Sequence, residues 1–194
     1  MIPATPDATK GNTVQLQLHT PETAPERSRP ILDGIASEVG FIPNLAAAAA
    51  ESPVLLAAFD GLRRAVATGE LDPVHREVAG LAVGVAVDNA YGIAFHSTVL
   101  ANLGVDESAI ERMRAGRSPV DPRCGAVYDT ARAVAIDRGK VDPALIERAT
   151  ALGFTDSQLL EIVAECAFAS LVGLIDNLAG RVELDPFLAP RAVT

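Results

Sequence analysis

The sequence predicts an all-α fold, a compact multi-helix bundle, on three observations. From about residue 23 on, each apolar segment begins near Asp, Ser, Thr or Pro and ends near Gly, which is the usual asymmetry of helix caps. Apolar residues recur with the helical period, as in the stripe of Leu55, Leu56, Phe59, Leu62 and Val66. The sequence shows no strand pattern after residue 22.

These signals mark a series of helical segments along the chain. Several of them begin at a proline, whose fixed φ and missing N–H suit the first helical turn. The expected segments are residues 25–40, 52–69 and 72–89, a segment that carries His96 and ends at Gly104, and residues 106–116, 121–139, 142–153 and 155–180.

Residues 1–22 differ from the rest of the chain in composition. They are rich in Pro, Thr and Gln, and Val14, Leu16 and Leu18 alternate with glutamines, so a short extended arm and a mobile tail both fit. We predict a flexible N-terminal arm over residues 1–22 and a single helical domain over residues 23–194.

A faint echo links two long apolar segments. Glu77 is followed by Asp88-Asn89, and Glu165 is followed by Asp176-Asn177 at the same spacing. Chance and an internal helical repeat are both consistent with this pattern.

Composition argues against several classes of partner. The net charge of −9 disfavours nucleic acid and anionic membranes as bulk partners. The apolar stretch 78–87 is too short to span a bilayer, and the first residues lack the basic and apolar regions of a signal peptide, so we expect a cytoplasmic protein. The three histidines are scattered and no phosphate-binding glycine loop is visible, so we expect no metal and no cofactor.

The most informative stretch is residues 71–104. Its apolar neighbours predict that Glu77 is buried. Asn89, Gly92 and His96 fall at i, i+3 and i+7, which would place them on one face of a continuing helix. A buried carboxylate near an imidazole can have its pKa shifted towards neutrality, so the pair could act as a general acid/base couple.

The same residues resemble the alkylhydroperoxidase-D and carboxymuconolactone decarboxylase family. Its peroxidases carry a Glu, a first Cys, a Tyr, a second Cys and a His at fixed spacing. This chain matches with Glu77, Tyr91 and His96, but Asn89 and Gly92 stand at the two cysteine positions. Segments such as 40–45, 71–77 and 184–190 extend the resemblance, to the peroxidase-related branch, over most of residues 24–190.

The departures from the family pattern argue against a dithiol peroxidase. Asn89 and Gly92 have no redox chemistry, and the resemblance assigns that chemistry to the two missing thiols. Cys124 and Cys166 lie in other apolar helical segments, where small buried hydrophobes are expected. Gly92 instead frees space beside His96, which would enlarge a pocket for an organic molecule.

The resemblance implies a cysteine-independent acid/base enzyme that acts on a small organic substrate, because decarboxylases of the family need no dithiol. Decarboxylation, isomerisation, elimination and cyclisation all stay open. We expect His96 as the main acid/base, Glu77 as its orienting partner and Tyr91 beside them. The expected substrate-binding residues are Asn89, Gly92, Asp176 and Asn177.

Two alternatives stay open beside this hypothesis. The chain could be a catalytically silent homologue that binds a ligand or serves in assembly, and a peroxidase is the less favoured option. The resemblance, together with the long apolar segments 77–90 and 159–175, also implies a homo-oligomer, a dimer, trimer or hexamer.

Overall fold

The structure, a computed structural model, describes residue 14 and residues 16–193. Within that part of the chain every regular element is a helix, which confirms the predicted all-α class. The helices are α1 (Arg29–Val39), α2 (Asn44–Ala49), α3 (Pro53–Val66), α4 (Pro73–Ala86), α5 (Ala90–Asn102), α6 (Glu107–Arg114), α7 (Pro122–Ile136), α8 (Pro143–Ala151), α9 (Asp156–Leu178) and the short 3-10 helix η1 (Pro186–Arg191).

Local capping explains most of the helix starts. The side chains of Ser52, Asp72, Asp121 and Asp142 each accept a backbone N–H from the first turn of the helix that follows them. Thr155 forms a capping box with Gln158 at the start of α9. These are the residues at which the sequence predicted that helices begin.

The two predicted segments, 72–89 and the one that ends at Gly104, correspond to α4 and α5, but the expectation that Asn89 lies on a continuing helix is wrong. The chain turns at 87–89, where Asp88 adopts a φ of 53°, and Asn89 is the N-cap of a separate helix, α5. Its side-chain oxygen accepts the N–H of Gly92 at 2.9 Å. Glu77 and His96 therefore come from two helices that pack against each other, α4 and α5.

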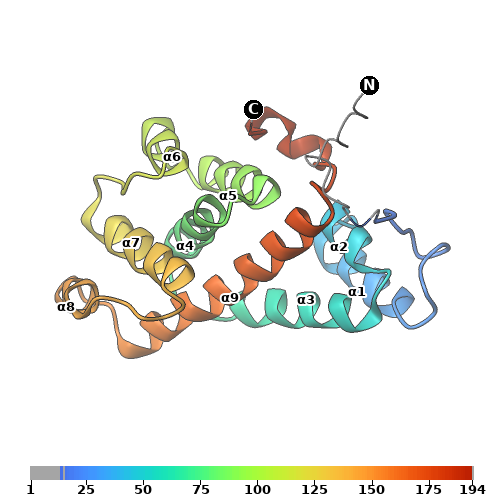
Figure 1. Cartoon of the computed structure of the whole chain (residues 1–194), viewed down its shortest axis with the longest axis horizontal. Coiled ribbons are helices and arrows are strands. Elements are labelled where there is room, and N and C mark those ends of the chain that lie inside the picture. Colours follow the sequence, from blue (N-terminus) through green and yellow to red (C-terminus); the bar gives the residue numbers. More distant parts are fainter. Residues whose placement is uncertain (1–13, 15, 194) are drawn as a thin grey trace, which may run out of the picture.

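Helix α9 is shared by two hydrophobic cores. Figure 1 shows it running diagonally through the molecule, with α1–α3 on one side and α4–α8 on the other. Ile162 and Ala169 belong to the core that α9 forms with α4 and α7, whereas Val172 and Ile175 belong to the core that it forms with α1–α3. Helix α5 also contributes to both cores, with Ile93 in the first and Tyr91 and Ala94 in the second, so α5 and α9 join the two halves of the molecule.

The described part of the predicted N-terminal arm lies against the second of these cores. The Val14 N–H donates to the Leu178 carbonyl at 3.2 Å, and the His19 N–H donates to the Ala47 carbonyl at 3.2 Å. Leu16 and Leu18 pack on the buried residues there. The rest of the predicted flexible arm, residues 1–13 and 15, lies outside the described residues.

The echo between Glu77 and Glu165 does not correspond to a repeated local structure. Glu77 and Asn89 are separated by the end of α4 and a turn, whereas Glu165 and Asp176 lie within the unbroken helix α9.

Candidate functional site

Glu77 and His96 meet in the interior, as the sequence predicts. The Nδ1–H of His96 donates to Oε2 of Glu77 at 2.8 Å, and each residue is only 6% exposed. Arg76 reaches the other carboxylate oxygen, with its Nε 3.5 Å from Oε1. The Nε2 atom of His96 has no hydrogen-bond partner among the described residues, so it is the nitrogen available to a ligand.

The surroundings favour the charged form of both groups. Burial would raise the pKa of Glu77, but the hydrogen bond and charge of His96, together with Arg76, outweigh it and lower that pKa. Burial would likewise lower the pKa of His96, but the hydrogen bond and charge of Glu77, with a smaller contribution from Glu165, raise it. The pairing thus favours the imidazolium form of His96, which can donate a proton from Nε2.

A glycine on α4 makes room for the imidazole. A Cβ atom at Gly80 would lie 2.1 Å from Cε1 and 2.4 Å from Nε2 of His96. The ring edge therefore rests directly on the α4 backbone. Because any side chain at residue 80 would displace the ring, Gly80 is needed for the geometry of the Glu77–His96 pair.

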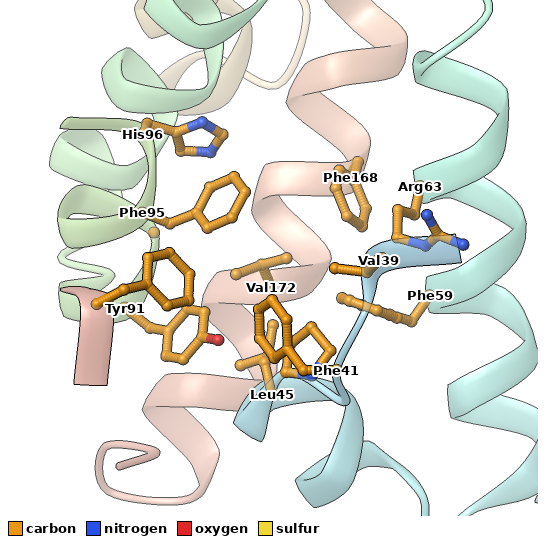
Figure 2. A pocket seen from close by; sticks show the side chains of 13 residues that line it. Val39, Phe41, Leu45, Phe59, Arg63, Tyr91, Phe95, His96, Phe168 and Val172 are labelled. Carbon is orange, nitrogen blue, oxygen red and sulfur yellow. The ribbon is translucent and has the colours of Figure 1, made fainter. Parts of the chain in front are cut away.

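His96 lies at the wall of an apolar cavity of about 240 Å³ between the two halves of the molecule. Figure 2 shows His96 and Phe95 facing Phe168 and Arg63 across it. Five of the six phenylalanines of the chain line it, so most of its surface is aromatic. The lining residues are Val39, Phe41, Pro43, Leu45, Phe59, Arg63, Tyr91, Gly92, Phe95, His96, Phe168, Val172 and Phe187.

Both cations that line the cavity are paired with carboxylates. Arg63 lies 2.6 Å from Glu38 and 2.7 Å from Asp60. Burial would lower the pKa of Arg63, but its hydrogen bonds to these two carboxylates raise it. His96 is paired with Glu77. A substrate carboxylate would therefore compete with an existing partner at either cation.

The structure places the ring of Tyr91 at the cavity but directs its hydroxyl elsewhere. The hydroxyl donates to Oδ2 of the buried Asp185. Burial, followed by the hydrogen bond and charge of Asp185, raises the pKa of Tyr91. The catalytic role predicted for Tyr91 is therefore not supported, because its hydroxyl group is hydrogen-bonded to a carboxylate that does not line the cavity.

Asn89 and Gly92, the residues at the cysteine positions, pack directly against each other. Asn89 is fully buried and does not line the cavity, and its Nδ2 has no partner among the described residues. Gly92 does line the cavity, and a Cβ there would lie 2.4 Å from Asn89 Nδ2. The missing Cβ of Gly92 therefore makes room for the amide of Asn89 rather than for a ligand beside His96, so the predicted enlargement of the pocket by Gly92 is wrong, and Asn89 acts as a helix cap.

Asp176 and Asn177 hold helix ends together and are not among the residues that line the cavity. The buried Asp176 accepts the N–H of Val182 at 2.8 Å and that of Tyr91 at 3.3 Å. Asn177 donates from Nδ2 to the Val87 carbonyl at 3.0 Å. These contacts join the end of α9 to the turn before α5, so the predicted substrate-binding role of both residues is not supported by their positions.

One buried carboxyl group near His96 was missed as a site residue. Glu165 of α9 is 3% exposed, and its charge acts on both His96 and Glu77. The only sequence signal for it was the equal spacing that pairs Glu165 with Glu77.

Cys166 is buried, as the sequence predicts, whereas Cys124 is only half-buried. The thiol of Cys166 contacts the Ala131 carbonyl at 3.6 Å. Burial raises the pKa of each thiol to about 12, which disfavours the thiolate that peroxide chemistry needs. In the described part of the chain, the acidic, histidine and cysteine side chains form no group suited to a metal ion.

Comparisons with known proteins agree with the fold. Residues 53–137 match the carboxymuconolactone decarboxylase family, while a comparison with curated proteins gives no significant match. A solved structure from Ralstonia eutropha JMP134, described as an alkylhydroperoxidase AhpD core and an uncharacterized peroxidase-related protein, is 24% identical with a TM-score of 0.77, covering 90% of this chain and 94% of that one.

Two further structures are similar over nearly their whole length. An uncharacterized peroxidase-related protein from Silicibacter sp. TM1040 is 18% identical, with a TM-score of 0.73 and coverage of 94% of this chain and 96% of that one. The debrominase Bmp8 is 17% identical, also with a TM-score of 0.73, covering 93% and 96%. A variant of that debrominase was crystallised in complex with 2,3,4-tribromopyrrole. At these identities the likeness concerns the fold.

Proposed function

We propose that this chain, whose residues 53–137 match the carboxymuconolactone decarboxylase family, is a cysteine-independent acid/base enzyme that acts on a small organic molecule. The observation that carries the proposal is the buried Glu77–His96 pair at the wall of a largely aromatic cavity. An acid/base catalyst needs a protonated group aimed at a space in which a substrate fits, and His96 meets this need.

In the proposed reaction His96 donates its Nε2 proton to the substrate and so becomes a neutral imidazole. Glu77 keeps Nδ1 protonated and fixes the orientation of the ring, as a carboxylate does for a catalytic histidine. The aromatic walls exclude water, which strengthens the electrostatic interactions of the charged groups.

The charges around the cavity favour a neutral substrate. Because the charges of Arg63 and His96 are each balanced by carboxylates, neither offers an uncompensated positive charge to a substrate carboxylate. Among the reactions that the sequence left open, this favours isomerisation, elimination or cyclisation of a neutral molecule over decarboxylation of an acid. That a debrominase of similar fold was crystallised with a small halogenated pyrrole supports a compact ring-containing substrate.

Replacement of His96 by Gln tests the proposal. Neutral aromatic and alicyclic compounds that raise the melting temperature of the protein are first selected as substrates, and their conversion is then followed by mass spectrometry. We expect His96→Gln to lower turnover about 100-fold or more, because general acid catalysis contributes at least that factor.

The matched controls are Cys124→Ser and Cys166→Ala, which remove the two thiols of the chain. Both should keep turnover close to that of the unmodified protein. Unchanged turnover in His96→Gln would exclude the acid/base role. Loss of turnover in either cysteine variant, with the fold retained by circular dichroism, would point to sulfur chemistry instead.

A further inference from the structure

Glu165 occupies a position that needs a chemical explanation. It lies on the same face of α9 as Phe168 and Val172, which line the cavity, at the spacing i, i+3 and i+7. Its Oε2 is completely buried and has no hydrogen-bond partner among the described residues. Burying a carboxyl group in this way costs free energy, so most buried carboxyl groups are paired or neutralised.

Charged groups from two neighbouring helices, α4 and α5, act on Glu165. The groups that act on it are Arg76 and Glu77 of α4 and His96 of α5. Burial raises the pKa of Glu165 to about 7, and the charge of Glu77 adds to this rise, while His96 and Arg76 oppose it. In return, the charge of Glu165 helps to raise the pKa of His96.

The three titratable groups of this cluster therefore hold their protons over different pH ranges. The pKa of Glu77 is lowered and that of His96 is raised, so the pair favours a carboxylate and an imidazolium. Glu165 alone of the three changes its protonation close to neutrality. A group that exchanges its proton near the working pH is the one suited to replenish an acid catalyst.

We propose that Glu165 is a positioning residue that acts through His96, as the store of the proton that re-forms the imidazolium after each turnover. This inference rests on the proposed function. In the first step the Nε2–H bond of His96 breaks and the proton passes to the substrate. In the second step a water molecule carries the proton, because Glu165 and His96 are not hydrogen-bonded to each other. The O–H bond of Glu165 breaks, the Nε2–H bond of His96 forms again, and Glu165 is left as a carboxylate that regains a proton from solvent.

Histidine NMR of the full-length protein tests the inference without any substrate. The chain has three histidines, so the ring signals of His96 are assigned by their absence in His96→Gln. In the unmodified protein we expect the His96 ring shifts to show an inflection near pH 7 that is caused by Glu165, in addition to the titration of the imidazole itself. In Glu165→Gln this inflection should vanish, and the imidazole should titrate about one pH unit lower.

The control is Glu161→Gln, one turn earlier on α9, whose carboxylate accepts the N–H groups of Glu70 and Leu71. It should leave the His96 titration unchanged. An identical His96 titration in Glu165→Gln and in the unmodified protein would overturn the proposal, whatever the turnover of His96→Gln shows. Failure of this inference would appear in the His96 titration, whereas failure of the proposed function would appear only in the turnover of His96→Gln, so the two are distinguishable.

A second measurement keeps the test open if Glu165→Gln fails to fold. The side-chain carboxyl carbon of Glu165 can be followed by ¹³C NMR in the unmodified protein. It should titrate near pH 7, and a transition near the ordinary value of 4.5 would overturn the proposal.

The same shift predicts how thermal stability depends on pH. Because the pKa of Glu165 is raised by folding, the stabilising effect of Glu165 is full below pH 4.5 and is lost as the pH rises through 7. The melting temperature should therefore fall more between pH 5 and pH 8 in the unmodified protein than in Glu165→Gln.

Discussion

At Gly80 the backbone of α4 and the imidazole of His96 approach so closely that no side chain fits between them. Gly80→Ala should push the ring away and break its hydrogen bond to Glu77. The loss of a charge-assisted hydrogen bond costs about 2 kcal/mol, and the better helix propensity of Ala returns about 1 kcal/mol. We therefore expect a small loss of stability but at least a tenfold loss of turnover, measured by urea denaturation and by the assay for His96→Gln.

Gly61→Ala is the matched control for this substitution. It lies in the interior of helix α3, where a Cβ atom would meet nothing within 4 Å. It should stabilise the protein by about 0.5–1 kcal/mol and leave turnover unchanged. Normal turnover in Gly80→Ala, with the ring signals of His96 unshifted, would show that the close contact does not hold the imidazole in place.

The sequence predicts the centre of the site but not its walls. Glu77 and His96 could be identified because a family pattern and an apolar context coincide within residues 71–104. The phenylalanines of the cavity come from five separate segments, so their convergence depends on how distant helices pack. Asn89 and Asp176 were predicted to bind substrate, yet each side chain instead accepts a backbone N–H group that has no partner in a helix.

At the scale of elements, short-range signals set most helix boundaries, and long-range contacts set the rest. Helices α3, α4 and α9 begin at capping residues that can be identified directly in the sequence. Helix α2 was not predicted, because no side chain of its own N-cap bonds to its first turn. The carboxylate of Asp185, far along the chain, accepts the Asn44 N–H instead, at 3.2 Å.

Asp176 connects three elements, and its removal should weaken the fold rather than the chemistry. Asp176→Ala would leave the N–H groups of Val182 and Tyr91 without their acceptor in a buried setting. Each buried, unpaired group costs about 1–3 kcal/mol, so we expect a loss of about 3 kcal/mol in the free energy of unfolding, measured in urea.

Asn177→Ala provides the comparison, because Asn177 is exposed, donates from Nδ2 to the Val87 carbonyl and accepts a hydrogen bond from the exposed side chain of Arg181 through Oδ1. It should cost less than about 1 kcal/mol. If Asp176→Ala instead kept full stability and lost ligand binding, the substrate-binding role predicted from the sequence would be restored.

At the scale of the whole molecule, the position of the cavity follows from the two-core design. The N-terminal helices and the α4–α8 group each bury their own apolar residues, and α9 contributes to both. The cavity opens where aromatic side chains from the two groups meet along α9 (Figure 1). A ligand there would contact both halves and should stabilise the molecule as a unit.

One face of α9 is apolar and exposed. By length and composition alone, this helix is also apolar enough to cross a membrane. Leu160 is 70% exposed, Leu174 is 69% exposed and Leu178 is 60% exposed. With Val163 and Ala167 they follow the helical period on one side of α9. We propose that this stripe packs against a second copy of the chain, which gives the predicted homo-oligomer a specific interface.

The mass in solution tests this interface. Size-exclusion chromatography with light scattering should give a multiple of 20.2 kDa for the unmodified protein and 20.2 kDa for Leu174→Glu, because an unpaired charge in an apolar interface costs several kcal/mol. Val54→Glu, at an isolated exposed valine of α3, should leave the oligomer intact. A single species of 20.2 kDa for the unmodified protein would contradict the proposal, and disruption by Val54→Glu would place the interface on the N-terminal helices instead.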